Sequence, residues 1–376
     1  MNIKVLLEEL VQLAASDLHL KPGIPPVVRL NGRLQRLNHP APTPKDMEEV
    51  AKQILTPIQR ERFENTKEVD FAFGVTGLAR FRANCYVQRN TIAMVFRHVP
   101  VKIRTVEELH LPPVIGDLAL RPRGMIIVTG TVGSGKSTTL AAMVQHINRS
   151  LNSAVISVED PIEFLHRDEK SIINQREVGS DTTSYQEALR HILRQDPDVI
   201  LIGEIRDKET MEIALKAADT GHLILTTLHT IDAMQTVHRV ISFFPPHQHQ
   251  EIRYLLASTV QAVISQRLLP HAGGDGMVPA VEVMVTTGTI RDCVTNPEKT
   301  GLIAQAMREG VTQHNMQTFD QALMKLYQEK QITLEDALRA SSNPHELTLR
   351  LKGIHATADK TWENFEKGDT VRTPEI

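Results

Sequence analysis

The sequence predicts an α/β protein in which a small α+β domain precedes a larger domain built on a parallel sheet. From about residue 124 onward, apolar strand-like runs alternate with amphipathic helix-like stretches, which is the pattern of strand–helix–strand crossovers. A glycine-rich run follows the first of these strand-like runs. In the first 100 residues, segments of alternating polarity are joined by tight turns, which predicts antiparallel strands beside a few helices.

Composition and charge are those of an ordinary globular protein. The 376 residues are 41% apolar and 23% charged. The 42 basic and 45 acidic residues give a net charge of −3, which argues against binding nucleic acid through bulk positive charge. Two cysteines, Cys85 and Cys293, are too few for a disulfide scaffold or a four-cysteine zinc site. The start is a poor signal peptide and no run of 18 apolar residues occurs, so we expect a cytoplasmic protein without a membrane span.

We expect the chain to be divided into four segments. An α+β domain covers residues 1–100, and a proline-punctuated linker covers residues 101–123. A nucleotide-binding domain with a C-terminal helical segment covers residues 124–352. Residues 353–376 have few aliphatic side chains and mixed charge, so we expect a flexible tail.

The elements of the first domain begin with a helix, a hairpin and a second helix. Apolar residues at helical spacing predict a helix over residues 3–14. Asn31 and Gly32 lie between two strand-like segments and predict a tight hairpin turn. Thr43 followed by Pro44 predicts the N-cap and first residue of the next helix.

A second predicted hairpin, at residues 79–98, places two arginines opposite each other. If Arg89 and Asn90 form a two-residue turn, Arg82 on one strand pairs with Arg97 on the other, and the apolar residues share the opposite face. Like charges at paired positions destabilise a sheet. Either an anion lies against the pair, or the two side chains splay apart into solvent.

The second domain is predicted to contain a parallel sheet. Its candidate strands are Met125–Thr129, Ala154–Val158, Val199–Ile202, Leu223–Thr227 and Val281–Val285. Amphipathic stretches between them imply helical crossovers. Thr318 and Gln321 form a candidate capping box at the start of a closing helix.

A P-loop pattern follows the first of these strands. Its residues are Gly130, Thr131, Val132, Gly133, Ser134, Gly135, Lys136 and Ser137, with Thr138 next. The glycines let backbone N–H groups turn toward phosphate oxygens, and the start of the following helix adds a favourable dipole. Lys136 supplies a cation to the β- and γ-phosphates, and the Ser137 hydroxyl can bind Mg²⁺. The sequence therefore predicts a site for a nucleoside triphosphate.

Carboxylates follow two of the predicted strands. Glu204 comes after an apolar strand, at the sheet edge where ligands bind, and could act on the Mg²⁺ shell or on the attacking water. Glu159, Asp160 and Glu163 follow another strand. Their mutual repulsion favours a bound cation, and position alone does not identify which of them acts on water.

Two histidines and two arginines are further candidates. His222 and His229 flank the strand-like run 223–227 and are either structural or sensors of the γ-phosphate. Arg190 and Arg194 stand four residues apart, so we expect them to share a helix face. They could reach a phosphate or pair with surface carboxylates.

Four stretches occur in the order and at the spacing of a known superfamily. They read GTVGSGKSTT, VEDPIEF, LRQDPDVILIGEIRD and TGHLILTTLHT. They resemble the Walker A, Asp box, Walker B and His box of the type II/IV secretion ATPases, and within these the chain resembles the PilT/PilU family of twitching-motility ATPases. This resemblance implies a homohexamer whose subunits have a PAS-like N-terminal domain and a RecA-like ATPase core. It also implies ATP hydrolysis that powers type IV pilus retraction through the inner-membrane platform protein, at the cytoplasmic face of that membrane.

The resemblance also implies roles for individual residues. Glu163 resembles the catalytic glutamate that polarises the attacking water, and Glu204 resembles the Walker B glutamate. Arg82 and Arg97 resemble arginines of the N-terminal domain that reach the γ-phosphate. The remaining matches are His222 and His229 with the His-box histidines, and Arg190 and Arg194 with further arginines near the nucleotide.

One segment departs from the pattern of the retraction ATPases. Their AIRNLIRE-like segment corresponds here to residues 289–297, where only Ile290 and Arg291 match, and residues 315–323 are more similar to PilU. The alternatives are therefore an accessory retraction ATPase that needs a paralogous partner, or another secretion-type ATPase. A RecA-like nucleic-acid translocase and a nucleotide-gated scaffold are less favoured.

Overall fold

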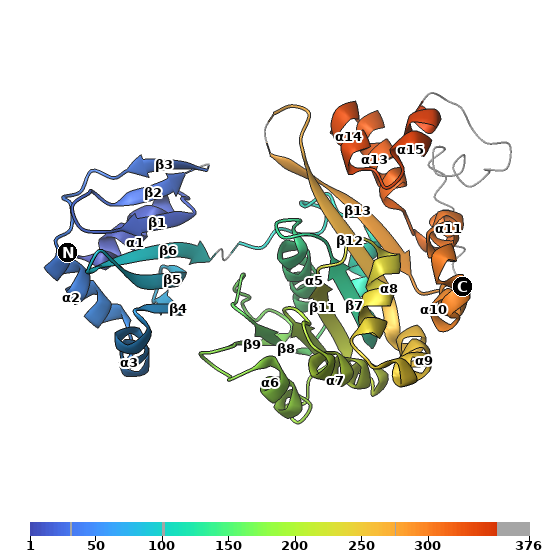
Figure 1. Ribbon diagram of the computed structural model, residues 1–376, viewed down its shortest axis with the longest axis horizontal. Coiled ribbons are helices and arrows are strands. Elements are labelled where there is room, and N and C mark those ends of the chain that lie inside the picture. The colour runs from blue at the N-terminus through green and yellow to red at the C-terminus, as the bar shows by residue number, and fades with distance from the viewer. Residues whose placement is uncertain (31, 100–101, 275, 352–376) are drawn as a thin grey trace. The chain divides into compact units, whose positions relative to one another are not determined.

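The computed structural model contains two compact units (Figure 1). It describes residues 1–30, 32–99, 102–274 and 276–351. The first unit consists of Met1–Lys102 together with Glu163–Leu165, and the second consists of Ile103–Ile162 and the chain from His166 onward. The predicted turn residue Asn31 and the predicted tail at 353–376 lie outside the described residues.

The predicted linker at 101–123 is shorter than expected. From Ile103 onward the chain belongs to the second unit, and Val106, Ile115 and Leu118 are buried in its core. The apolar residues between the prolines form helix α4 (Val114–Ala119), which packs against a helix of the nucleotide-binding core. Because these side chains are buried in the second unit, the prolines around them do not indicate a linker.

The first unit is a six-stranded antiparallel sheet with three helices, in the strand order β3-β2-β1-β6-β5-β4. Its elements are α1 (Ile3–Gln12), β1 (Asp17–Leu20), β2 (Val27–Leu30), β3 (Arg33–Arg36), α2 (Pro44–Ile54), α3 (Pro57–Thr66), β4 (Glu68–Val75), β5 (Ala79–Gln88) and β6 (Thr91–Val99). Thr43 caps α2 through a capping box with Asp46. Leu7 of α1 and Met47 of α2 are fully buried with Phe81 of β5 in one core. The unit has the predicted α+β architecture, and its PAS-like type stays a prediction.

The register of the β5–β6 hairpin is the predicted one. Arg82 pairs with Arg97, and Phe81, on the opposite face, pairs with His98. Arg89 and Asn90 form the two-residue turn with φ of 48° and 59°, the left-handed values that match the twist of antiparallel strands.

The second unit is a seven-stranded sheet between two layers of helices. Its further elements are β7 (Gly124–Thr129), α5 (Lys136–Ser150), β8 (Ala154–Glu159), β9 (Ile172–Glu177), α6 (Tyr185–Ile192), β10 (Val199–Ile202), α7 (Lys208–Asp219), β11 (Leu223–Leu228), α8 (Ala233–Ser242), η1 (Pro246–Gln248), α9 (His249–Thr259), β12 (Val260–Pro270), β13 (Met277–Val285), α10 (Gly288–Thr295), η2 (Pro297–Leu302), α11 (Ile303–Glu309), α12 (Val311–His314), α13 (Phe319–Gln328), α14 (Leu334–Ala340) and α15 (Pro344–Leu351). The strand order is β13-β12-β7-β11-β10-β8-β9.

The predicted parallel sheet needs one correction, at the candidate strand Val281–Val285. The strands β12, β7, β11, β10, β8 and β9 are parallel, but β13 runs antiparallel to β12. The sequence analysis missed β9 and β12. The polar residues of β9 and the Ser265-Gln266-Arg267 run inside β12 hide the apolar pattern of a strand. Without β12 in view, the antiparallel hairpin that ends at β13 could not be anticipated.

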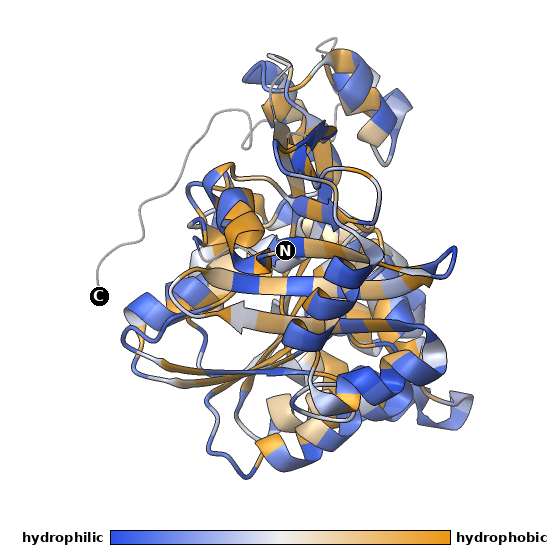
Figure 2. Cartoon of the chain, turned by 90° about the vertical axis from the view of Figure 1, so that its left-hand side faces the viewer, coloured by the Kyte–Doolittle hydropathy of each residue, from blue (hydrophilic) through white to orange (hydrophobic). Residues whose placement is uncertain are grey.

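Alternate residues of β7 face the two helical layers. Met125 and Ile127 lie in the core formed with α6 to α9, whereas Ile126 and Val128 lie in the core formed with α4 and α5. The strand is therefore apolar on both faces, as in parallel sheets covered on both sides. The surrounding helices carry both hydrophobic and hydrophilic residues, as amphipathic helices do (Figure 2).

One local prediction near the C-terminal end of the described chain is confirmed. Thr318 and Gln321 form the capping box of α13. Helix α10 ends at Thr295, before Pro297 begins the short helix η2. Within the described ranges, no helix is long and apolar enough to cross a bilayer.

Candidate nucleotide-binding site

The P-loop connects β7 to α5 and depends on its glycines. Gly130, Gly133 and Gly135 have backbone φ angles of 143°, 80° and 94°, values that residues other than glycine rarely adopt. A Cβ atom at Gly130 would lie 2.5 Å from both the Gln266 carbonyl oxygen and the Ser134 hydroxyl. A larger residue at Gly130 would therefore force the loop away from β12.

Lys136 is the first residue of α5, and its side chain folds back over the loop. Its ammonium donates hydrogen bonds to the carbonyl oxygens of Gly130 at 2.8 Å and Thr131 at 2.9 Å. Burial lowers the pKa of Lys136, and the nearby Glu204 carboxylate partly opposes this effect. Because the ammonium is held by neutral carbonyls, phosphate oxygens would be stronger partners. Ser137 follows with an exposed side chain, and Thr138 is partly buried.

Polar residues of β12 support the P-loop from the side. The Thr129 hydroxyl donates to the Ser265 hydroxyl at 3.0 Å, and the Gln266 amide nitrogen donates to the Thr139 hydroxyl at 2.8 Å. All four side chains are buried. Sequence reasoning missed Ser265 and Gln266, and the signal that could have found them is a pair of polar residues inside an otherwise apolar run.

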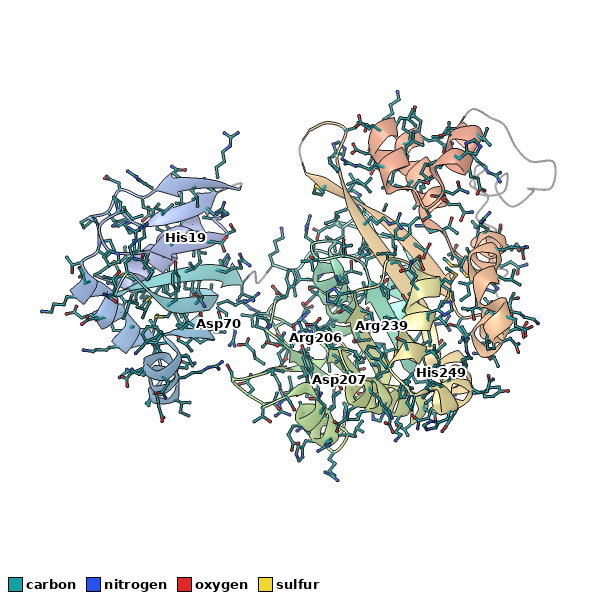
Figure 3. All side chains as sticks on the ribbon, viewed as in Figure 1. His19, Asp70, Arg206, Asp207, Arg239 and His249 are labelled. Carbon is teal, nitrogen blue, oxygen red and sulfur yellow. The ribbon has the colours of Figure 1, made fainter. Side chains whose placement is uncertain are left out.

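Glu204 follows β10 at the same edge of the sheet as the P-loop. Its carboxylate forms ion pairs with Arg206 and with the ring Nε2 of His229, the latter at 2.9 Å. Burial raises the pKa of Glu204, but the hydrogen bonds from His229 and Arg206 outweigh it, and the pKa is lowered overall. Glu204 is therefore an ionised carboxylate suited to Mg²⁺ or its water shell. Arg206, labelled beside Asp207 in Figure 3, was not among the predicted residues.

The two predicted histidines lie at opposite ends of β11. His229 follows the carboxyl end of the strand, where it contacts Glu204. His222 precedes the amino end, and its Nδ1 lies 3.0 Å from the Ala217 carbonyl oxygen. The six residues of β11 lie between the two histidines, and seven steps of about 3.3 Å separate them by about 23 Å. Of the two histidines, His229 lies at the edge of the sheet that carries the P-loop. His222 lies at the other end of the strand and contacts the backbone there, which agrees with the structural role that the sequence analysis left open.

The acidic residues after β8 do not gather into one cluster. The Glu159 carboxylate accepts hydrogen bonds from Ser157 at 2.7 Å and Gln175 at 3.2 Å. Glu163 belongs to the first compact unit, where it accepts a hydrogen bond from Arg82 at 2.8 Å. In the described part of the chain, no group of three or more His, Cys, Asp or Glu side chains is arranged to hold a metal ion. The expected cation among these carboxylates is therefore not supported.

Arg97 already has an anionic partner within the first unit. Asp17 of β1 lies directly opposite Arg97 in the sheet, and its Oδ1 accepts a hydrogen bond from Arg97 Nε at 2.8 Å. Burial raises the pKa of Asp17, but hydrogen bonds from Ser16 and Arg97 lower it overall, so the carboxylate is charged. The like-charged arginine pair is thus compensated by carboxylates, which the sequence analysis did not identify. A polar residue at the start of the SDLHL strand was the available signal.

The predicted shared helix face of Arg190 and Arg194 needs correction. Helix α6 ends at Ile192, so Arg194 lies in the turn that follows. Arg190 forms ion pairs with Glu187 and Glu209, which is the surface pairing left open as an alternative. Glu209 lies in the first turn of α7, which Asp207 caps. Arg190 and Arg194 do not share a helix face, because α6 ends before Arg194.

Comparison with known proteins agrees with this geometry. The family model described as type II/IV secretion system protein matches residues 110–359. The type IV pilus ATPase PilU of Pseudomonas aeruginosa is 39% identical over 360 residues, covering 96% of this chain and 94% of PilU. The type IV pilus retraction ATPase PilT of the same organism is 42% identical over 344 residues, covering 92% of this chain and 99% of PilT.

A solved structure shares both the sequence and the fold. The crystal structure of the pilus retraction motor PilT with bound ADP is 44% identical to this chain. It superimposes with a TM-score of 0.87 and covers 93% of this chain and 99% of the PilT chain. The P-loop, Glu204 and His229 thus lie in an α/β core shared with a nucleotide-binding motor, and the chain belongs to the type II/IV secretion system protein family.

Proposed function

We propose that this chain is an ATPase that hydrolyses ATP to power the retraction of type IV pili. The observation that carries the proposal is the meeting of the P-loop, Glu204 and His229 at the carboxyl edge of one sheet. Ligands bind at this edge in open α/β sheets. The relative PilT, which is named for pilus retraction and matched over nine-tenths of this chain, supplies the mechanical role.

The chain's own residues divide the work on ATP. Backbone N–H groups of the P-loop and the Lys136 ammonium bind the phosphates, and Lys136 exchanges its carbonyl partners for phosphate oxygens. The Ser137 hydroxyl and the ionised Glu204 are the oxygen donors that would hold Mg²⁺, which when bound neutralises charge on the phosphates. His229, bonded to Glu204, is positioned to respond to the γ-phosphate, and Glu163 is proposed to polarise the attacking water.

The mechanical cycle is proposed to use the arginines of the first unit. Arg82 and Arg97 share a sheet face, and both pair with carboxylates. A γ-phosphate that competes for these guanidinium groups would make their pairing depend on the nucleotide. We further propose a homohexamer at the cytoplasmic face of the inner membrane that acts on the pilus platform protein.

An accessory role beside a paralogous retraction ATPase is the second candidate. PilU matches a slightly larger share of this chain than PilT does, 96% against 92%. The segment that differs from the retraction ATPases forms α10. This helix ends at Thr295, two residues before Pro297. In this role the chain would hydrolyse ATP but would retract pili only together with its partner.

Hydrolysis is tested with the purified chain, ATP and Mg²⁺. We expect steady turnover in the parent protein, none after chelation of Mg²⁺, and none in Lys136→Ala. Lys216→Ala is the matched control, because Lys216 is exposed on α7 and pairs with its helix neighbour Glu212. A parent protein without turnover would contradict the proposal, and turnover that requires DNA would favour a translocase instead.

A further inference from the structure

One buried carboxylate of the second unit contacts the starts of two helices. Glu282 of β13 is only 7% exposed. Its Oε1 accepts a hydrogen bond from the backbone N–H of Ala233 at 2.9 Å, and the backbone N–H of Phe319 lies near enough to the carboxylate to favour its charged form. Ala233 is the first residue of α8, and Phe319 is the first residue of α13.

The side-chain caps of α8 and α13 do not bind the first N–H group of either helix. The Asp232 side chain caps α8 by accepting from the N–H of Gln235, and the Thr318 side chain caps α13 by accepting from the N–H of Gln321. The first N–H of each helix still needs an acceptor, because the first four have no partner inside the helix. A buried carboxylate also needs donors, and two positive helix ends supply them.

Helix α8 is tied to the loop that carries His229. Only Thr230, Ile231 and the N-cap Asp232 separate His229 from the helix. The Thr230 and Thr236 hydroxyls lie 2.6 Å apart, and the Thr236 hydroxyl donates to the Asp232 carbonyl oxygen at 2.7 Å. The loop is therefore fastened to the first turn of α8, so the position of α8 determines the position of His229 beside Glu204.

Helix α13 is tied to the C-terminal helical segment. The Arg267 guanidinium of β12 lies 3.8 Å above the centre of the Phe319 ring, a cation–π contact. Arg267 also donates a hydrogen bond to the carbonyl oxygen of Ala340, the last residue of α14. A shift of α13 and α14 would therefore move the Phe319 N–H that lies beside the Glu282 carboxylate.

We propose that Glu282 is a positioning residue for ATP hydrolysis, which couples helices α13 and α14 to the loop that carries His229. The inference rests on the proposed ATPase function. It assigns a role to the C-terminal helices, because a force on them would reach the γ-phosphate side of the site through one carboxylate.

The charge on Glu282 is set by its surroundings. The pKa of Glu282 is raised to about 7, mainly by burial; the Asp232 carboxylate adds to the rise, whereas the hydrogen bond from Ala233 and the Arg267 guanidinium oppose it. Asp320 is a further charge near Arg267. The ionised form, which accepts from both helix ends most strongly, dominates above neutral pH.

The test compares the full-length parent with Glu282→Gln. Glutamine keeps the size of the side chain, but only its carbonyl oxygen can accept, so one helix end loses its partner. We expect kcat to fall by about tenfold because His229 is displaced. We expect the KM for ATP to stay within about twofold because the P-loop is untouched. In Glu282→Gln, amide hydrogen exchange should become faster at residues 229–233 and at residues 318–321.

Three comparisons decide the outcome. Glu251→Gln, an exposed position on α9, should match the parent in both measurements. In a His229→Ala background, Glu282→Gln should cause no further loss of kcat, whereas an independent second loss would overturn the coupling. Exchange that is unchanged, or faster in only one of the two segments, would also overturn it. A parent without turnover would contradict the proposed function while the exchange result still decides whether Glu282 joins the two helices. If Glu282→Gln does not fold, Glu282→Asp is read in the same way.

Discussion

Removing the titrating group at Glu282 should change how stability responds to pH. Burial raises the pKa of this carboxyl from its usual 4.5 to about 7 in the folded protein. Between these values the unfolded chain has released the proton, whereas the folded chain retains it. Protonated Glu282 therefore contributes stability that is fully present below about pH 4.5 and is lost as the pH rises through about 7. One pKa unit corresponds to about 1.4 kcal/mol, so the loss amounts to about 3 kcal/mol.

Thermal unfolding of the parent and of Glu282→Gln between pH 5 and pH 8 measures this loss. For a unit of this size, 1 kcal/mol corresponds to about 2–4 °C, so the parent should lose about 6–12 °C more than the variant across the range. The comparison uses the change with pH and not the absolute Tm, because glutamine also leaves one helix N–H without an acceptor. Glu251→Gln should follow the parent. Parallel curves for the parent and Glu282→Gln would refute the reasoning.

Three further predictions concern the nucleotide site. Lys136→Ala should abolish turnover and weaken nucleotide binding, because it removes the ammonium that is held on the P-loop backbone; normal turnover would overturn the site assignment. Glu163→Gln should leave ATP binding near that of the parent while lowering kcat by about 10²-fold. A parallel loss of binding would mean that Glu163 holds the metal or the fold instead. Substituting both Arg82 and Arg97 with Gln should lower turnover strongly in a folded protein, since neither lies on the apolar face. Hydrolysis at the parent rate would contradict their proposed role.

The parts of the fold that the sequence predicted well are those with a local cause. The β5–β6 register followed from the apolar alternation and a two-residue turn, and the structure has the same pairing. The N-cap of α2 and the capping box of α13 lie within four residues of chain, so their residues identify them without tertiary information. The P-loop is also local, because a strand, three glycines and a helix start are contiguous.

The parts that the sequence did not predict depend on contacts between distant segments. Ser265 and Gln266 reach the P-loop only because β12 pairs with β7. Asp17 compensates Arg97 only because β1 lies beside β6. Glu282 reads as a charged interruption of an apolar strand, and its two helix ends become visible only in three dimensions.

The histidines show the limit of reasoning from strand ends alone. Both flank β11, and the sequence analysis assigned them the same candidate role. The direction of the strand separates them, because only the carboxyl end of a parallel strand faces the nucleotide edge. Once β11 is placed beside β7, His229 stays a candidate sensor and His222 has a local backbone partner.

The central claim, that this chain powers pilus retraction, is tested most directly by complementation. A strain that has pili but lacks its retraction ATPases would express this chain alone, and twitching motility would be measured. The account predicts that the parent chain restores twitching and that Lys136→Ala, expressed at the same level, does not. Failure of the parent chain to restore twitching unless a PilT partner is also present would contradict the claim and support the accessory role.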